Sequence, residues 1–396
     1  MARVLLAWEM GANMGHIDRL LVLARALRAR GHEAVFVLRD LSRAQPRIAA
    51  EGYAMGQAPV WLPRLAHPPQ LANYTAVLAN AGWLDAAGLA GLLYGWRTWF
   101  DLLRPEVLVC DHAPTALLAA RSSAVPMRVW ACGSSFEIPP TGAGVFPAFM
   151  PGGPREAAAC AAHDAALLQP ANAALALLGA PPLGRLTDLF APAQRVLTTL
   201  PELAHYAGYG PEVTWAGPSY AGDSGCAPQW PEAAGRRAFV YLEPSHAAFE
   251  PVLKALQACG LCAIVHAKGL APEAVARLAS PRLRFEAQPL RMDEAVAQAN
   301  VVVSHGGQGT LAAAALAGKP QLLLPQHMEQ AMAARRVASA GLGLVLSPGL
   351  TCQALLRRLL DEPAFVQAAA AFAARHAGQT PGQTAERIAQ LIEAAL

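Results

Sequence analysis

The sequence predicts an α/β protein of two doubly wound domains, in which helices cover both faces of each parallel sheet. Three observations support this prediction. Strand and helix patterns alternate in the first half of the chain, a stretch rich in Pro and Gly follows at residues 206–237, and the alternation then resumes. The length of 396 residues also favours two cores over one.

The first domain opens with a βαβ unit. Arg3–Trp8 is a continuous apolar run, as expected for a strand that is covered on both faces. Apolar residues at helical spacing, with arginines on the other side, predict a helix over Ile17–Arg30, and Gly31 suits its C-terminal end. Ala34–Leu38 is the second strand. A further strand is expected over residues 106–110, a helix over 115–121 and a strand over 127–131.

The second domain repeats this alternation. Strands are expected over residues 238–242, 261–266, 300–304 and 321–324, with helices over 249–258, 272–278 and 309–317. We therefore expect a first domain over residues 1–216, a linker over 217–237 and a second domain over 238–380. The last helix, within residues 381–396, could belong to either domain, including a return to the first. Ligands of such sheets bind beyond the carboxyl ends of strands, so the loops after strands are the candidate sites.

Composition narrows the classes of function. Hydrophobic residues make up 54% of the chain and charged residues 15%, with a net charge of +3 and both signs interspersed. No concentrated basic face points to nucleic acid, and no run of 18 apolar residues points to a membrane span. The apolar N-terminus meets Glu9 and a turn instead of a cleavage site, and seven scattered cysteines suit reduced thiols. We expect a cytoplasmic protein without a transmembrane segment or a nucleic-acid partner.

A glycine-rich turn follows the strand at residues 300–304. Ser304–Thr310 reads Ser-His-Gly-Gly-Gln-Gly-Thr and joins that strand to the start of a helix. Glycines let backbone amides approach a ligand closely, and a helix N-terminus adds roughly half a positive charge. Such a turn favours a diphosphate ligand, although tight α/β turns also use glycine for structural reasons alone.

The sequence around this turn resembles the donor motif of the family 1 glycosyltransferases, the class of macrolide, flavonoid and glucuronosyl transferases. That motif runs His-Gly-Gly-x-Gly-Thr, then Ala-Gly-x-Pro, then Pro-x-x-x-Asp-Gln. The chain shows His305–Thr310, Ala317–Pro320 and Pro325–Gln330 in the same order and at matching spacing. The resemblance is close over this segment and weaker over most of the chain.

This resemblance implies a GT-B fold, in which two Rossmann-like domains face a cleft and the C-terminal domain holds a nucleotide sugar. The diphosphate would lie against the glycine turn, and the sugar hydroxyls against the Glu-Gln pair that ends the motif. The implied donor-binding residues are Ser245, His305, Gly306, Gly307, Gln308, Gly309, Thr310, Glu329 and Gln330.

Three departures from the family pattern leave the donor open. Glu329 replaces the usual Asp, and Ala287 stands where the family often has a Trp that stacks on the nucleobase. The family's Ser-x-Gly turn after the first strand of this domain is replaced by Leu242–His246, which brings in Glu243. We expect a UDP- or dTDP-linked sugar as co-substrate, without naming the sugar.

The N-terminal domain carries a candidate catalytic pair. Gly15-His16 matches the family's Gly-His at the first turn, although Asp18-Arg19 replaces the Asn-Pro that usually follows. In the family this His is the general base, and Asp111, after the strand at 106–110, occupies the position of its carboxylate partner. An imidazole titrates near neutral pH and can take a proton from a hydroxyl during attack. A turn His is otherwise often a surface or capping residue, and an Asp at a strand end often caps the next helix.

The expected reaction is an inverting, metal-independent transfer of the sugar to a hydroxyl of a small hydrophobic acceptor. The leaving diphosphate is stabilised by the dipoles of the glycine turn. No Asp-x-Asp motif or His/Cys cluster has the spacing of a metal site, so we expect no metal and no cofactor. Aromatic residues within 61–100 and the loop 136–149 either line an acceptor pocket or fill the core.

Two other functions remain open. A GT-B enzyme could act on a lipid-linked sugar or be a nucleotide-sugar epimerase. Arg64, Arg97 and Arg104 near the aromatic residues keep peripheral membrane contact open. Alternatively, the chain is a GT-B-like binding protein without activity, which His16 and Asp111 argue against and Glu243 and Ala287 favour.

Overall fold

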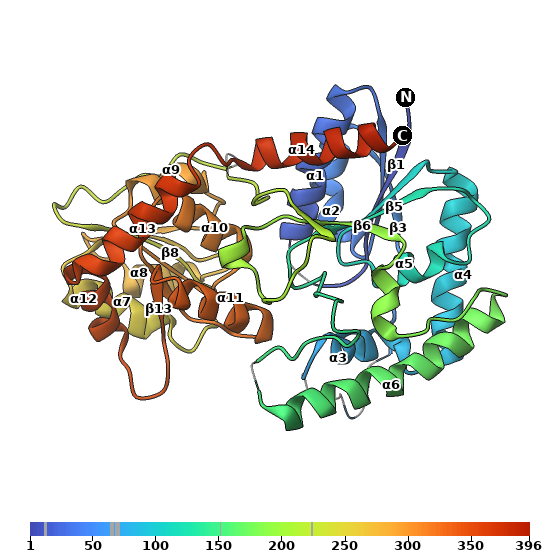
Figure 1. Cartoon of the computed structure of the whole chain (residues 1–396). Helices are drawn as coiled ribbons and strands as arrows, with labels where there is room; N and C mark the ends of the chain where they lie inside the picture. Colours follow the sequence, from blue (N-terminus) through green and yellow to red (C-terminus); the bar gives the residue numbers. More distant parts are fainter. Residues whose placement is uncertain (12–13, 64–66, 68–71, 151, 223–224) are drawn as a thin grey trace. The chain divides into compact units, whose positions relative to one another are not determined.

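The structure, a computed structural model, describes residues 1–11, 14–63, 67, 72–150, 152–222 and 225–396. The chain forms two compact units, each with its own parallel sheet (Figure 1). Unit 1 consists of Met1–Leu200, Tyr206–Ser219 and Gly382–Leu396, and unit 2 of Pro201–His205 and Tyr220–Pro381. The last helix thus belongs to unit 1, although the chain reaches it only after completing unit 2.

Unit 1 holds a seven-stranded parallel sheet in the order β3-β2-β1-β4-β5-β6-β7. Its strands are β1 (Arg3–Trp8), β2 (Glu33–Leu38), β3 (Ala54–Gln57), β4 (Val107–Cys110), β5 (Arg128–Gly133), β6 (Ala193–Leu197) and β7 (Val213–Trp215). Its helices are α1 (Gly15–Ala29), α2 (Leu41–Ile48), α3 (Tyr74–Leu78), α4 (Ala86–Leu103), α5 (Pro114–Ala120), α6 (Pro154–Leu177) and α14 (Pro381–Ala395). Short helical turns lie at Ala49–Glu51, Ala79–Trp83 and Leu186–Phe190.

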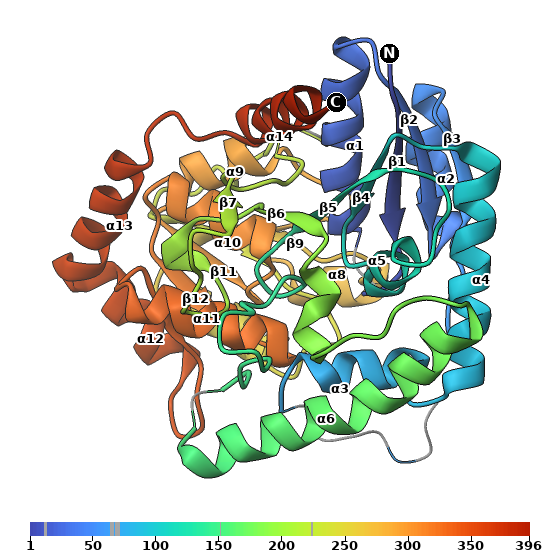
Figure 2. The same cartoon turned by 45° about the vertical axis from the view of Figure 1, so that its right-hand side comes forward.

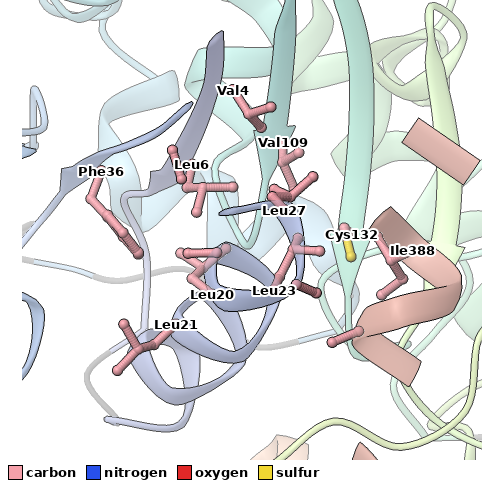
Figure 3. Packing of buried hydrophobic residues seen from close by; sticks show 14 of the residues in the cluster. Val4, Leu6, Leu20, Leu21, Leu23, Leu27, Phe36, Val109, Cys132 and Ile388 are labelled. Carbon is pink, nitrogen blue, oxygen red and sulfur yellow. The ribbon is translucent and has the colours of Figure 1, made fainter. Parts of the chain in front are cut away.

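The core on one face of this sheet lies beneath α1 and α14. Figure 3 shows Leu20 and Leu27 of α1 against the strands, and Ile388 of α14 beside Cys132 of β5. The side chains of all four are buried. Arg30 then holds α14 by ion pairs to Glu386 (3.3 Å) and Glu393 (2.5 Å). On another side of the unit, α6 lies beside α3 and α4 (Figures 1 and 2).

Unit 2 holds a six-stranded parallel sheet in the order β10-β9-β8-β11-β12-β13. Its strands are β8 (Arg237–Tyr241), β9 (Cys262–His266), β10 (Leu283–Glu286), β11 (Val301–Ser304), β12 (Gln321–Leu323) and β13 (Gly343–Val345). Its helices are α7 (Phe249–Ala258), α8 (Pro272–Leu278), α9 (Met292–Gln298), α10 (Gln308–Leu316), α11 (Met328–Ser339), α12 (Cys352–Asp361) and α13 (Pro363–Arg375), with a helical turn at Pro201–Leu203.

Both sheets share one topology. In each, the first strand (β1 or β8) is central, with the second and third strands on one side and the fourth and later strands on the other. The direction of winding therefore reverses between the first and the fourth strand, and ligands of such sheets bind at this switch point. The predicted class, two doubly wound parallel α/β domains, is confirmed.

The aromatic residues of the first domain are mostly core. Tyr74, Trp83, Trp96 and Phe100 are fully buried in unit 1, whereas the Tyr94 ring is half exposed. No single helix in the described part of the chain is long and apolar enough to cross a membrane. One pair of helices, Tyr74–Trp83 and α4, is long and apolar enough when the two are taken together, but they are bent by 83° with respect to each other. Arg64 lies outside the described residues.

Candidate functional site

The switch point of unit 1 brings together the ends of β1 and β4. The two strands pair in register up to Ala7 and Cys110, and Asp111 N then donates to Ala7 O (2.9 Å). The chain beyond β1 turns back into α1, which places His16 in the first turn of that helix. Two residues that are far apart in the sequence thus meet at one edge of the sheet.

His16 and Asp111 form the pair that the sequence predicts. His16 Nδ1 lies 3.0 Å from Asp111 Oδ1, and both side chains are buried. The His16 ring stacks on the Trp8 indole at 5.3 Å between centroids, which fixes the plane of the imidazole. Its Nε2 faces Gly11, where an added Cβ would lie 2.6 Å from that nitrogen. Any side chain at position 11 would therefore press on this nitrogen.

Two charged residues that were not predicted complete this cluster. Arg19, one turn after His16, donates from Nε to Asp111 Oδ2 (3.1 Å) and from Nη2 to Asp111 Oδ1 (2.6 Å). Its Nη2 also lies 3.1 Å from Glu137 Oε1 and 2.9 Å from His16 Nδ1. Burial would lower the pKa of Arg19, but Asp111 and Glu137 outweigh it and raise that pKa. Burial would likewise raise the pKa of Glu137, yet its neighbours, chiefly Arg19, lower it, so both groups are ionised.

A sequence signal for Glu137 existed. It follows the end of β5, and loops after strands are where ligands bind in this fold. Arg19 was visible as a departure from the family pattern, but the direction of its side chain cannot be read from the sequence. The Ser134 hydroxyl donates to Glu137, so the segment after β5 orients this carboxylate itself.

His112 and Glu9 border the cluster. His112 has a positive φ of 49°, a strained conformation for a residue with a side chain. Burial lowers its pKa to about 4, so the ring is neutral, and its Nε2 has no hydrogen-bond partner among the described residues. Glu9 accepts hydrogen bonds from Thr115 N (2.5 Å) and Trp96 Nε1 (2.7 Å), while burial raises its pKa to about 7.

Three residues of this cluster have the arrangement of possible metal ligands. His16, His112 and Glu137 each offer a ligand atom, and these atoms lie within 4.8 Å of one another. The Arg19 guanidinium, hydrogen-bonded to Glu137, opposes a divalent cation at this position because like charges repel strongly in a buried site. The absence of a metal stays a prediction.

The switch point of unit 2 holds the glycine turn. β11 ends at Ser304, and α10 begins at Gln308, so the turn lies at the N-terminus of that helix. Ser304 Oγ accepts from Gly306 N (3.1 Å), and Gly306 has a φ of +86°. The turn packs against neighbouring elements, since a Cβ at Gly306 would lie 3.6 Å from Gln330 O and one at Gly309 would lie 3.0 Å from Tyr220.

His305 is half-buried at this turn. Burial lowers its pKa, with smaller contributions from the nearby His327 and His246, and Glu243 acts in the opposite direction. The ring is therefore neutral near pH 7, and its Nδ1 has no hydrogen-bond partner within the described ranges. Such a nitrogen can donate to or accept from a ligand, depending on its tautomer.

The remaining predicted donor residues surround the turn on two loops. Gln330, in the first turn of α11, accepts from Gln326 N (2.8 Å) and is buried, while Glu329 precedes it on the same helix. Thr310 is buried in the first turn of α10. Ser245 is exposed in the loop after β8, which is fixed by His246 Nε2 donating to Leu324 O (3.0 Å). β8 and β12 flank β11, so both loops lie beside the glycine turn.

Comparison of the sequence with known protein families gives a match in the C-terminal part of the chain. Residues 252–393 match the family described as erythromycin biosynthesis protein CIII-like, C-terminal domain. The matched segment takes in most of unit 2 together with α14. The glycine turn, Glu329 and Gln330 lie inside the matched segment, whereas Ser245, His16 and Asp111 precede it.

One curated relative supports the same relation over a short stretch. The elloramycin glycosyltransferase ElmGT of Streptomyces olivaceus is 46% identical over 71 residues. The match spans 18% of this chain and 18% of the relative's length.

Solved structures show the fold over the whole length. The glycosyltransferase of kitacinnamycin has a TM-score of 0.74 at 21% identity and covers 100% of this chain and 99% of its own. The glycosyltransferase SsfS6 of Streptomyces sp. SF2575, complexed with thymidine diphosphate, has a TM-score of 0.66 at 20% identity and covers 100% of both. The predicted GT-B fold and the resemblance to GT-B glycosyltransferases are confirmed.

Unit 1, which lies mostly outside the matched segment, also contains an apolar pocket of about 580 Å³. It lies between the loop 140–148, the start of α6 and Ala207-Gly208, and Val145, Phe146 and Cys160 contribute to its wall. Phe146 packs edge-on against Tyr74, and Tyr74 in turn against His112. The loop 136–149 therefore lines a pocket, whereas most of the aromatic residues of 61–100 are core.

Proposed function

We propose that the protein is a glycosyltransferase that moves a sugar from a nucleoside diphosphate to a hydroxyl of a small hydrophobic acceptor. The observation that carries the proposal is the buried His16–Asp111 pair at the switch point of unit 1. A binding protein without activity has no need of an imidazole held by a carboxylate with Nε2 directed away from that carboxylate. The same pair therefore disfavours the non-catalytic alternative.

The donor would bind to unit 2. The amides of Gly306, Gly307 and Gly309 and the N-terminus of α10 suit a diphosphate, and the neutral His305 adds a hydrogen bond without charge. Glu329 and Gln330, at the start of α11, are proposed to bind the sugar hydroxyls. Because SsfS6 and the spinosyn rhamnosyltransferase SpnG are complexed with thymidine diphosphate, we favour a dTDP-linked sugar.

In this reaction His16 takes the proton of the acceptor hydroxyl as its oxygen attacks the anomeric carbon. Displacement from the opposite side inverts the anomeric configuration, and the nucleoside diphosphate leaves with its new charge on the glycine turn. The apolar pocket beside Phe146 is proposed to receive the acceptor, since its volume suits a small hydrophobic molecule. No metal is required, because backbone dipoles stabilise the leaving group.

Binding of the donor can be tested by thermal unfolding with thymidine, uridine and guanosine diphosphates. Saturation at about 100 times the dissociation constant stabilises the folded state by about 2.7 kcal/mol, which raises the melting temperature by a few degrees. We expect thymidine diphosphate to give the largest rise. If none of the three changes the melting temperature, the proposed donor site is wrong.

Catalysis can be tested with His16→Ala. We expect the rate of transfer from a dTDP-sugar to an aromatic alcohol to fall by about 10²–10⁴-fold, while the thermal shift with thymidine diphosphate is unchanged. A chelator should leave the wild-type rate unaffected. Unchanged transfer by the variant would exclude His16 as the base.

A further inference from the structure

The buried Arg19 beside His16 has fewer hydrogens on Nη2 than there are acceptor atoms around that nitrogen. Arg19 Nη2 carries two hydrogens but lies within hydrogen-bond distance of three acceptor atoms. These atoms are Asp111 Oδ1 (2.6 Å), Glu137 Oε1 (3.1 Å) and His16 Nδ1 (2.9 Å). A guanidinium prefers ionised carboxylates to a neutral ring nitrogen, so Asp111 and Glu137 take the two hydrogens. His16 Nδ1 is then left to donate its own hydrogen to Asp111.

This count fixes the tautomer of His16. With the hydrogen on Nδ1, the lone pair is on Nε2, the atom beside Gly11. Without an acceptor at position 137, the second Nη2 hydrogen turns to His16 Nδ1. The ring hydrogen then moves to Nε2, and that nitrogen can no longer accept a proton. Glu137 thus keeps the ring ready to act as a base through Arg19.

The charges of the cluster also favour a role for Glu137 in the protonation of His16. Asp111 and Glu137 carry two negative charges and Arg19 one positive charge, so the cluster has a net charge of −1 while His16 is neutral. When His16 takes a proton, the net charge becomes zero. Arg19 by itself would oppose an imidazolium at this position, and Glu137 offsets it.

Apart from Glu9, the other groups near His16 are uncharged at neutral pH. Trp8 and Gly11 are uncharged, and His112, next to Asp111 and facing the His16 ring, is neutral because burial lowers its pKa to about 4. Tyr74 of α3 is neutral because burial raises its pKa well above the usual value. Glu9 accepts hydrogen bonds from Trp96 and Thr115, and its pKa of about 7 gives it a partial negative charge at neutral pH.

We propose that Arg19 and Glu137 are positioning residues for His16: Arg19 clamps Asp111, and Glu137 takes the remaining guanidinium hydrogen and supplies the charge that an imidazolium needs. The role as base rests on the proposed function, whereas the tautomer does not. The two can therefore be tested separately.

The first experiment needs no substrate. Long-range ¹H–¹⁵N NMR spectra of ¹⁵N-histidine-labelled protein report the tautomer and the titration midpoint of His16, whose signals are assigned with His16→Gln. We expect the Nδ1–H tautomer in the wild type. Glu137→Gln keeps the acceptor oxygen but removes the charge, so the tautomer is kept and the midpoint falls by about one pH unit. Glu137→Leu removes both, so the Nε2–H tautomer appears.

The second experiment measures transfer in the same variants. We expect the acidic limb of the kcat/KM profile to move to lower pH in Glu137→Gln and kcat to fall further in Glu137→Leu. Glu51→Gln is the matched control, because it removes a partly exposed carboxylate that pairs with Arg25 of α1, the helix that also carries His16 and Arg19. The control should change neither the His16 signals nor the rate.

Two results separate the possible failures. If the His16 tautomer and midpoint are the same in the wild type and in both Glu137 variants, the positioning role is wrong. If they change as expected but the wild type transfers no sugar, the proposed function is wrong, whereas the positioning of His16 by Arg19 and Glu137 is confirmed. Should Glu137→Leu fail to fold, the midpoint in Glu137→Gln decides alone.

Discussion

At the scale of single residues, Glu9 gives a pH dependence with a defined sign. Burial raises its pKa from 4.5 to about 7, so the native state binds this proton more tightly than the unfolded chain. The free energy of unfolding therefore falls as pH rises from about 4.5 to about 7 and is level above that range. Relative to Glu9→Gln, which does not titrate, the wild type should lose about 3 kcal/mol between pH 4.5 and 8.

Urea unfolding of both proteins at pH 4.5, 6 and 8 measures this difference directly. Other titrating groups cancel, because they are common to the two proteins. The exposed Glu33→Gln serves as a control and should show no such trend. A wild-type-minus-Glu9→Gln difference that does not vary with pH would mean that folding does not shift the pKa of Glu9.

The sequence predicted half of the charged cluster in unit 1. His16 and Asp111 could be found because a family motif and the ends of two strands coincide at them. Arg19 and Glu137 could not, since their roles depend on which way long side chains point in a buried space. Glu137 is also 118 residues from Arg19, and the two meet because β1 pairs with β4 and β4 pairs with β5.

At the scale of elements, the turn between β11 and α10 depends on the backbone conformation of one glycine. Gly306 has a φ of +86°, and an added Cβ would meet nothing closer than 3.6 Å. Gly306→Ala should therefore cost about 1–2 kcal/mol of stability from backbone strain and not from a clash. Because the strain re-aims the amides of the turn, the affinity for thymidine diphosphate should also fall, by tenfold or more.

Gly349 offers a matched control in the same unit. Its φ is +83°, and a Cβ there would meet no atom within 4 Å. Gly349→Ala should lose a similar stability but keep its affinity, as measured by calorimetric titration. Equal affinities in the two variants would show that the turn does not hold the diphosphate.

Long, strongly patterned elements were predictable, and short or featureless ones were not. The apolar runs of β1, β8 and β11 and the periodic α1 were found close to their observed bounds. Among those missed, β3, β7, β10 and β13 have three or four residues each and lie at or next to the edges of the sheets. The alanine-rich α6 was missed because alanine marks neither a buried nor an exposed face.

At the scale of the whole molecule, the chain leaves unit 1, builds unit 2 and returns with α14. Ala385, Ile388, Ala389 and Ile392 of this helix are buried in the core of unit 1. Ile388→Ala should destabilise unit 1 by about 2–5 kcal/mol, through lost burial and the cavity that remains. The sequence left the position of this helix open, because an amphipathic helix fits either sheet equally well.

Calorimetry with and without thymidine diphosphate can assign that loss to a unit. The ligand is proposed to bind to unit 2, so it should raise the unfolding temperature of unit 2 in the wild type and in Ile388→Ala alike. The substitution should lower the unfolding temperature of unit 1 alone. Val366→Ala, at a half-exposed position on α13 of unit 2, is the control and should change little. If Ile388→Ala instead abolishes the response to the nucleotide, the two units do not fold independently, and α14 then couples the stability of unit 2 to the core of unit 1.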